Sequence, residues 1–208
     1  QIVQKQLGLE DQGVVVTEGF SQWVLEDNFC AGRPAWEDVG VTIVDDVTPF
    51  EHMKLRMLNG THSTLAYLGF MAGHEFVADA ANDSDFQQLL LGMWQDEIIP
   101  TLSMPSGIDL QSYAHDLMAR YQNPELHHRL YQIAMDGSQK LPQRLLGTLR
   151  DHLAANRLPK RILLAIAGWM RYVTGIQVNG NSFEVQDPLT PKLRQLAQES
   201  GFLNGQLN

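Results

Sequence analysis

Residues 49–63 read Pro49-Phe50-Glu51-His52-Met53-Lys54-Leu55-Arg56-Met57-Leu58-Asn59-Gly60-Thr61-His62-Ser63. Four chemically different polar side chains stand among the Leu and Met residues: Glu51, Lys54, Asn59 and His62. An α-helix turns about 100° per residue, so with Lys54 at zero, Glu51 falls at about 60° and His62 at about 80°. Asn59 falls at about 140° on the same geometry. The spacing therefore predicts a helix that carries all four on one face.

These side chains suit the oxidation of an alcohol, in which a proton must leave the oxygen while the oxygen gains negative charge. Lys54 is our candidate general acid/base, provided that burial lowers its pKa from about 10.4. An apolar wall that could bury it is available from Leu55, Leu58, Leu65 and Tyr67. Asn59 and His62 can donate hydrogen bonds to the oxygen.

Each residue also has an ordinary interpretation. A lone lysine on a helix is usually solvated, a lone histidine is usually a core residue, and an asparagine before glycine is often a turn residue. Glu51 could equally complete a capping box with Thr48, with Pro49 in the first turn. The combination and its spacing favour the functional interpretation for Lys54, Asn59 and His62.

Composition places the chain among ordinary globular proteins. Its 208 residues are 44% hydrophobic and 19% charged, which allows one domain with a real core. The net charge of -9 argues against nonspecific binding to nucleic acid. A single cysteine, Cys30, excludes a disulfide framework and favours the reducing cytoplasm. The apolar runs are shorter than the roughly 20 residues that cross a bilayer, so no membrane span is expected.

The pattern along the chain predicts a mainly α fold. We expect the end of a helix at 1–7, an extended stretch at 13–17, a short helix or ordered loop at 19–30, and a short strand within 39–47. Helices are predicted over 48–71, 84–102, 109–121, 124–135, 140–155, 160–173 and 191–199, with Ser84 as a cap and Gly73 as a stop. No strand is followed by Gly-x-Gly-x-x-Gly, so a dinucleotide-binding fold is not expected within this chain.

A second group of polar residues spans Asp136-Gly137-Ser138-Gln139-Lys140-Leu141-Pro142. It has the pattern of a loop leading into a helix N-terminus, which suits an anion or a polyol. Lys140 and Arg144 lie one turn apart and could pair with a substrate carboxylate, although a capped helix with two solvent-facing cations fits the sequence alone better. Arg129 is a further candidate. No metal site is expected, because His127 and His128 are adjacent and point about 100° apart on a helix.

The spacing Lys-x4-Asn-x2-His at Lys54, Asn59 and His62, with a Glu three residues earlier, resembles the signature of the polyol-specific long-chain dehydrogenases. This family includes mannitol 2-dehydrogenase and fructuronate reductase (mannonate oxidoreductase). The similarity runs from about Thr17 to the end of the chain. The matching segments are Trp23-Val24-Leu25-Glu26-Asp27, Gly32-Arg33-Pro34-Ala35-Trp36-Glu37, Lys54-Leu55-Arg56-Met57-Leu58-Asn59-Gly60 and Met135-Asp136-Gly137-Ser138-Gln139-Lys140-Leu141-Pro142-Gln143-Arg144.

The resemblance implies a two-part enzyme. Residues 1–21 would be the linker from a missing N-terminal Rossmann domain that binds most of the NAD. Residues 22–208 would be a multihelical substrate domain like the C-terminal domain of 6-phosphogluconate dehydrogenase-type enzymes, incomplete at its C-terminus. The implied reaction is hydride transfer between NAD(H) and a hexuronate, aldonate or polyol, with D-mannonate and D-fructuronate preferred. The partners would be the small-molecule substrate and the missing domain, with no nucleic acid and no membrane.

The resemblance also implies roles for individual residues. Lys54 would be the acid/base, Asn59 and His62 would hold the reacting oxygen, and Glu51 would pass the proton to solvent. Lys140 would be a substrate contact, with weaker support for Arg144 and Arg129. The alternative to this enzyme is a noncatalytic helical interaction module, in which the same residues would have structural roles.

Overall fold

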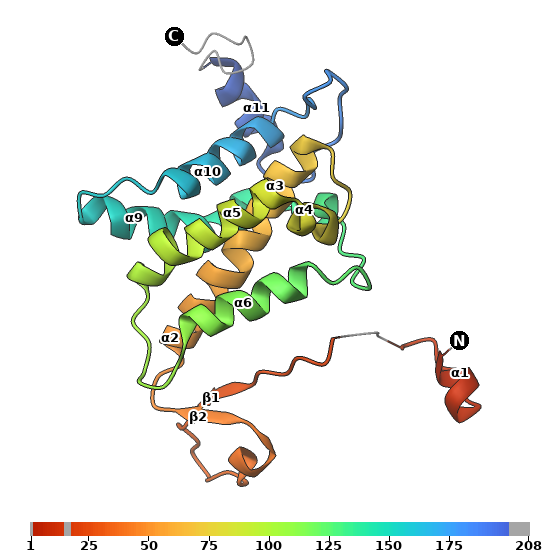
Figure 1. The fold of residues 1–208 in the computed structure, drawn as a ribbon, viewed down its shortest axis with the longest axis vertical. Coiled ribbons are helices and arrows are strands. Elements are labelled where there is room, and N and C mark those ends of the chain that lie inside the picture. The colour runs from red at the N-terminus through yellow and green to blue at the C-terminus, as the bar shows by residue number, and fades with distance from the viewer. Residues whose placement is uncertain (1, 15–17, 200–208) are drawn as a thin grey trace.

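The computed structural model describes residues 2–14 and 18–199, and this part of the chain is mainly helical (Figure 1). The α-helices are α1 (Ile2–Leu7), α2 (Thr48–Met53), α3 (Thr61–Ala72), α4 (Val77–Asn82), α5 (Ser84–Gly92), α6 (Leu110–Tyr121), α7 (Leu130–Ile133), α8 (Gly137–Leu141), α9 (Gly147–Ala154), α10 (Lys160–Tyr172) and α11 (Thr190–Glu199). The remaining elements are the strands β1 (Val24–Glu26) and β2 (Thr42–Val44), the 3-10 helices η1 (Trp36–Val39) and η4 (Ile99–Thr101), and the π-helices η2 (Lys54–Gly60), η3 (Met93–Ile98) and η5 (Pro142–Leu146).

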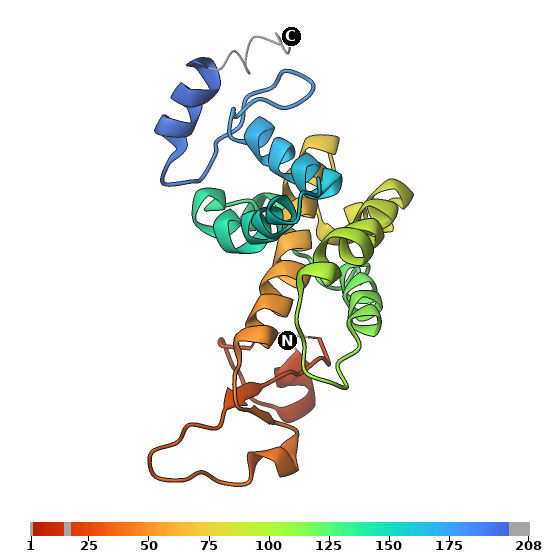
Figure 2. The same cartoon turned by 90° about the vertical axis from the view of Figure 1, so that its left-hand side faces the viewer.

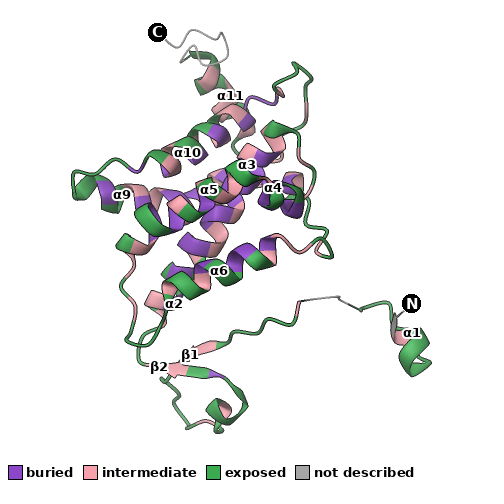
Figure 3. Cartoon of the chain, viewed as in Figure 1, coloured by how far each residue is buried: buried purple, intermediate pink, exposed green. Residues whose placement is uncertain are grey.

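A continuous helical rod made of α2, η2 and α3 organises the body. Its α3 end packs against α10, α7 and α4, and the buried residues gather around it (Figure 3). Trp94, Tyr67 and Tyr172 are almost fully buried there, and large aromatic side chains contribute most of the apolar area in such a core. The rod ends at Gly73, whose φ of 95° lies in the left-handed region that glycine adopts readily. The predicted stop at Gly73 is therefore confirmed.

The predicted helix starts need correction. Thr48 and Glu51 form no capping box, because the chain turns one residue earlier: Asp46 Oδ1 accepts from the Thr48 backbone N–H at 2.9 Å. The cap of α5 is Asp83 rather than Ser84, since the Asp83 side chain accepts from the backbone N–H of Asp85. Carboxylates outcompete hydroxyls here because an ionised acceptor makes the stronger hydrogen bond.

Three of the predicted helices contain π-helical turns, which the sequence pattern did not predict. They are η2, η3 and η5. A π-turn closes its hydrogen bonds from residue i to residue i+5 and so holds more residues per turn than an α-turn. Residues after η2 are therefore rotated relative to an ideal α-helix, and the angles predicted for Asn59 and His62 are wrong.

Between residues 72 and 137 two differences from the predicted helices occur: one predicted helix is mostly absent, and one helix is present that was not predicted. The helix predicted over 124–135 is reduced to α7, because Phe76 and Arg129 form an antiparallel bridge that holds the chain extended before it. The chain also forms α4, which was not predicted. Helix α4 buries a face of small residues that includes Ala80 and Ala81.

The connector before the rod is irregular, as Figure 2 shows beyond the α2 end. β1 and β2 pair in parallel, with Val24 opposite Thr42, so the strand predicted within 39–47 is confirmed over three residues only. The segment 19–30 contains β1 rather than a short helix, and residues 15–17 of the predicted extended stretch lie outside the described residues. Arg33 bonds Asp27 and Glu37 and holds the loop between the strands.

The carboxylates of Glu97 and Glu18 each connect two elements of the structure through hydrogen bonds. Glu97, which is 5% exposed, accepts from the backbone N–H groups of Arg161 and Ile162 and so caps α10. Glu18 makes two hydrogen bonds to Arg120 and ties the connector to α6. No helix in residues 2–14 and 18–199 is both long enough and apolar enough to cross a bilayer.

Candidate active site

Side chains from neighbouring helices fix the backbone of η2. Trp94 Nε1 donates to the Met57 carbonyl at 2.9 Å, and the Tyr121 hydroxyl donates to the Leu58 carbonyl at 2.6 Å. The wider π-turn leaves carbonyls without their α-helical partners, and these two donors satisfy them. The backbone that carries Asn59 is therefore held from two sides.

Asn59 and His62 have polar atoms that are buried without a partner. Both residues are half-buried, and neither Asn59 Oδ1 nor His62 Nε2 has a hydrogen bond within the described residues. A ligand is one group that would satisfy such a pair. Buried polar atoms of Thr148, His152 and Tyr172, outside this group, also have no partner within the described residues. The side chains of Asn59 and His62 are only half-buried, and each has an unsatisfied polar atom. These features favour a functional role over that of a satisfied core histidine and a turn asparagine.

The surroundings of His62 keep its imidazole neutral. The ring stacks on Tyr121 at a centroid distance of 5.5 Å, and the ring of His128 lies 6.1 Å away. Burial, together with electrostatic interactions with His128, Arg144, Lys140 and Arg120, lowers the pKa of His62 to about 3. At neutral pH the ring therefore has one N–H donor and one acceptor nitrogen.

Lys140 and Arg144 lie close to His62, as their effect on its pKa requires. Lys140 Nζ donates to the Met135 carbonyl at 2.6 Å, and Arg144 Nη1 donates to Ser63 Oγ at 3.0 Å. Burial lowers the pKa of both cations. They are partly buried, so the alternative of two solvent-facing cations is wrong.

The close approach of η2 and η5 depends on Gly60. A Cβ added to Gly60 would lie 2.7 Å from the backbone carbonyl oxygen of Arg144, well inside van der Waals contact. The absence of a side chain at this position therefore lets Arg144 approach the turn that carries Asn59.

The predicted anion site at a helix N-terminus is wrong. The helix begins at Gly137, so Lys140 lies within it, and the backbone N–H of Ser138 already donates to Asp187 Oδ2 at 2.7 Å. A carboxylate of the chain itself thus occupies the position proposed for a ligand. Lys140 and Arg144 remain available through their side chains.

Glu51 and Lys54 lie at the exposed end of the rod, and the predicted apolar wall around Lys54 is wrong. Leu65 and Tyr67 are fully buried in the core, on a part of the rod remote from Lys54 in sequence, while Lys54 itself is exposed. The π-turn and the end position explain this difference. Within the described residues, neither Glu51 nor Lys54 has a side-chain hydrogen bond or ion pair.

Arg129 stands apart from the other candidates. Its side chain is 65% exposed, lies over Phe76 and approaches Glu75 at 3.6 Å. The structure therefore brings Lys140 and Arg144 near His62, holds the Arg144 backbone against Gly60, which follows Asn59, and leaves Arg129 outside.

Sequence reasoning did not identify Ser63, Tyr121 and His128 as parts of this site. Ser63 anchors Arg144, and the other two contact the His62 ring. Ser63 could have been found from its position beside His62. Tyr121 and His128 come from distant segments, and nothing local in the sequence relates them to His62.

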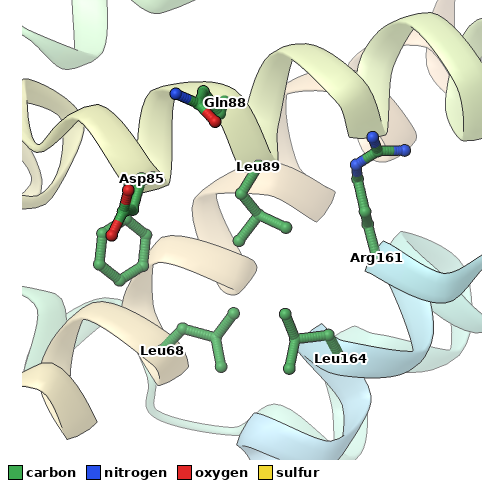
Figure 4. A pocket seen from close by; sticks show the side chains of 7 residues that line it. Leu68, Asp85, Gln88, Leu89, Arg161 and Leu164 are labelled. Atoms are coloured by element: carbon green, nitrogen blue, oxygen red, sulfur yellow. The ribbon is translucent and has the colours of Figure 1, made fainter.

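Two cavities help to locate the site. A small pocket of about 130 Å³ lies beside His62 and is lined by Glu18, Leu58, His62, Val77, Arg120, Tyr121, Leu126 and His128. A larger pocket of about 560 Å³ lies between α5 and α10. Figure 4 shows Leu68, Leu89 and Leu164 facing one another in it, with Arg161 at one end. The smaller pocket touches the site through His62 and is not lined by Asn59, Lys140 or Arg144. In the larger pocket, Arg161 pairs with Asp96.

No group of three or more His, Cys, Asp or Glu residues suited to a metal ion occurs in the part of the chain that the structure describes.

Comparison with known proteins gives relatives over nearly the whole chain. Uncharacterized oxidoreductase YdfI of Escherichia coli K12 is 50% identical over 95% of this chain and 40% of its own length. D-mannonate oxidoreductase of the same organism is 48% identical over 97% of this chain and 42% of its own length. The structure of Pseudomonas fluorescens mannitol 2-dehydrogenase, a ternary complex with NAD and D-mannitol, aligns with a TM-score of 0.82 at 38% identity, covering 90% of this chain and 38% of that one.

The chain thus spans about two fifths of the length of these relatives. The family model for the mannitol dehydrogenase C-terminal domain matches residues 46–202, which include every candidate site residue named above. This match covers most of the chain, and we conclude that the chain belongs to the mannitol dehydrogenase family through its C-terminal domain.

Proposed function

We propose that this chain is the substrate-binding and proton-transfer part of an NAD-dependent secondary-alcohol dehydrogenase. Its substrate is a hexuronate, aldonate or polyol, with the D-mannonate/D-fructuronate pair preferred. Residues 22–208 serve as the substrate domain, and residues 1–21 link it to a nucleotide-binding domain. The 48% identity to D-mannonate oxidoreductase and the NAD and D-mannitol bound to the structural relative support this proposal.

One observation carries the proposal: Asn59 Oδ1 and His62 Nε2 are buried without partners beside two cations. A substrate hydroxyl would satisfy Asn59 Oδ1 by donating to it, and a substrate oxygen would satisfy His62 Nε2 by accepting its N–H. As the hydroxyl proton leaves, the oxygen gains alkoxide character, and N–H groups of Asn59 and His62 stabilise its charge until hydride departs from the carbon and the carbonyl forms. Lys140, which already bonds the Met135 carbonyl, is positioned to donate to another substrate oxygen.

Lys54 accepts the hydroxyl proton in this proposal, and Glu51 relays it to solvent. A lysine must be neutral to act as a base, and desolvation favours the neutral form. Lys54 is exposed in this chain, so substrate and the nucleotide-binding domain supply the burial when they cover the α2 end of the rod. Glu51, equally exposed and one turn earlier, stays in contact with solvent.

NAD supplies the hydride acceptor when it is bound. The residues present do not form a dinucleotide cradle, because β2 is the strand that leads into a helix and the connection Asp45-Asp46-Val47 contains no glycine. The cofactor is therefore held mainly by the nucleotide-binding domain. The exposed thiol of Cys30 suits a reducing compartment such as the cytoplasm.

The test is NADH oxidation with fructuronate in the full-length protein that contains this chain. Lys54→Ala should lower kcat by roughly 10²–10⁴-fold, the usual contribution of an acid/base group, and added primary amines should restore part of the rate. Lys160→Ala, a change at an exposed lysine on α10, is the matched control and should leave the rate unchanged. A decrease of less than about threefold for Lys54→Ala would contradict the assignment.

A further inference from the structure

Arg144 differs in its partners from Arg56 on the rod and Arg120 on α6. Arg56, which is 9% exposed, bonds the carboxylate of Asp151, and Arg120 bonds Glu18 through two hydrogen bonds. Arg144 has no acidic partner within the described residues. Its Nη1 donates to a neutral hydroxyl, that of Ser63, and its Nε is buried without any partner.

This arrangement is costly unless something completes it. A buried cation without a counter-charge is unfavourable, and burial accordingly lowers the pKa of Arg144. Lys140 lies close enough that Arg144 lowers its pKa as well. Asp136 and Asp187 act on Lys140 in the opposite direction, but neither forms an ion pair with Lys140 or Arg144. Within the described residues, neither Lys140 nor Arg144 thus has a carboxylate paired with it, although the net charge of the chain is -9.

The position of Arg144 relates this charge to the reacting atoms. Ser63, which holds its Nη1, directly follows His62 in α3. The Arg144 backbone carbonyl faces Gly60, which directly follows Asn59. Arg144 is therefore anchored to the residues that directly follow His62 and Asn59 in the chain.

We propose that Arg144 is the specificity residue that makes this site prefer substrates with a carboxylate. The carboxylate is the missing counter-charge, and the planar guanidinium fork matches its two oxygens. This inference rests on the proposed function and deepens it, since it selects sugar acids over neutral polyols. D-mannonate, in the name of one relative, is such a carboxylate, whereas D-mannitol in the structural relative is neutral.

The experiment compares two substrates in the full-length protein: a ketohexuronate and a neutral ketohexose, each reduced with NADH. Arg144→Gln should lower kcat/KM for the ketohexuronate by roughly 10–100-fold, the range for one charge-assisted hydrogen bond. The kcat/KM for the ketohexose should change by less than about threefold. The ratio of kcat/KM for the ketohexuronate to kcat/KM for the ketohexose should therefore decrease strongly. Arg150→Gln, at an exposed arginine on α9, is the matched control and should preserve the ratio.

A second measurement needs no variant. The unmutated protein should reduce the primary amide of the same ketohexuronate at least about 10-fold less efficiently than the acid, because the amide keeps the shape and loses the charge. If Arg144→Gln fails to fold, as circular dichroism would reveal, this comparison decides the question alone. A phosphorylated ketohexose reduced better than the ketohexuronate would show that the site selects phosphate and would overturn the inference.

The outcomes separate this inference from the function on which it rests. Equal loss for acid and ketohexose in Arg144→Gln, or no loss for either, overturns the specificity role while turnover by the unmutated protein still supports the dehydrogenase. Absence of NADH-dependent turnover with every substrate overturns the proposed function, and the specificity role with it.

Discussion

The two ends of the helical rod differ in how far this chain encloses the proposed site. We call the end with Asn59 and His62 the deep end, and the end with Glu51 and Lys54 the shallow end. At the deep end, Asn59 and His62 are held by Trp94, Tyr121 and neighbouring backbone, and their polar atoms are shielded from solvent. At the shallow end, the side chains of the proposed proton path stand in solvent without partners.

The difference shows which part of the proposed chemistry is preorganised. Hydrogen-bond donors that are fixed before the reaction cost no reorganisation when charge develops, so a rigid deep end is where they are most effective. A proton relay must exchange with water and can tolerate exposure. Changes at the deep end should therefore affect the rate most, and changes at the shallow end should leave the fold intact.

The largest effect is expected from Asn59→Leu. Removing one oxyanion donor should lower kcat by roughly 10²–10³-fold. The melting temperature should stay the same or rise, because the substitution removes a buried polar group that lacks a partner. Glu51→Gln, at the shallow end, is the paired variant and should cost about 10-fold or less in kcat. Steady-state kinetics and differential scanning calorimetry on both variants check the contrast, and a larger rate loss for Glu51→Gln would reverse it.

A smaller effect is expected from Gly60→Ala, which disturbs the contact between η2 and η5. The new Cβ would meet the Arg144 carbonyl at 2.7 Å, and because that neighbour is backbone, one of the two turns must move. Overpacking of this kind costs about 1–3 kcal/mol, measurable by urea unfolding. Gly19→Ala is the matched control, since its Cβ would meet nothing within 4 Å. Equal stability of the two variants would show that η2 and η5 can separate freely.

The smallest effect concerns pH. The pKa of His62 is about 3 in the folded protein and about 6.5 in the unfolded chain. Between these values the unfolded state binds the proton and the folded state does not, so stability is complete above pH 6.5 and falls as the pH falls. Allowing for the partly exposed ring, we expect a loss of about 1 kcal/mol from pH 6.5 to pH 5.

Urea unfolding of the unmutated chain and of His62→Gln at several pH values measures this contribution. The unmutated chain should lose its share of stability below pH 6.5, whereas the Gln variant should lack that part of the slope. His115→Gln, at an exposed histidine on α6, controls for the general loss of an imidazole. Parallel slopes for His62→Gln and the unmutated chain would mean that the ring titrates normally.

The sequence predicted the helices well where periodicity and punctuation agree. Most helices ended where Gly, Asn or Pro interrupts the pattern, as at Gly73. It failed where a long-range contact decides the local conformation. The bridge between Phe76 and Arg129 replaces part of a predicted helix, and no residue near 124–129 signals it.

For the site, the sequence named candidate residues but not how they are arranged. His62, Lys140 and Arg144 were among the candidates, and the structure brings these three near one another. The prediction that Lys54 is buried was wrong, because the angle of a side chain on a helix gives its direction and does not tell which residues cover it. The π-turn could not be predicted either, since it depends on donors such as Trp94, far along the chain.

That π-turn has a further consequence for how this site tolerates change in chain length. Because η2 fits an additional residue into its turn, a one-residue deletion within 54–60 could be absorbed as an ordinary α-helix with its hydrogen bonds intact. The repaired helix would keep Lys54 at nearly the same angle to His62, because one residue fewer in α-turns completes about the same rotation as the π-turn. A shorter and more regular version of this segment would thus keep the relative direction of these two side chains and would take away the free carbonyls that Trp94 and Tyr121 now satisfy.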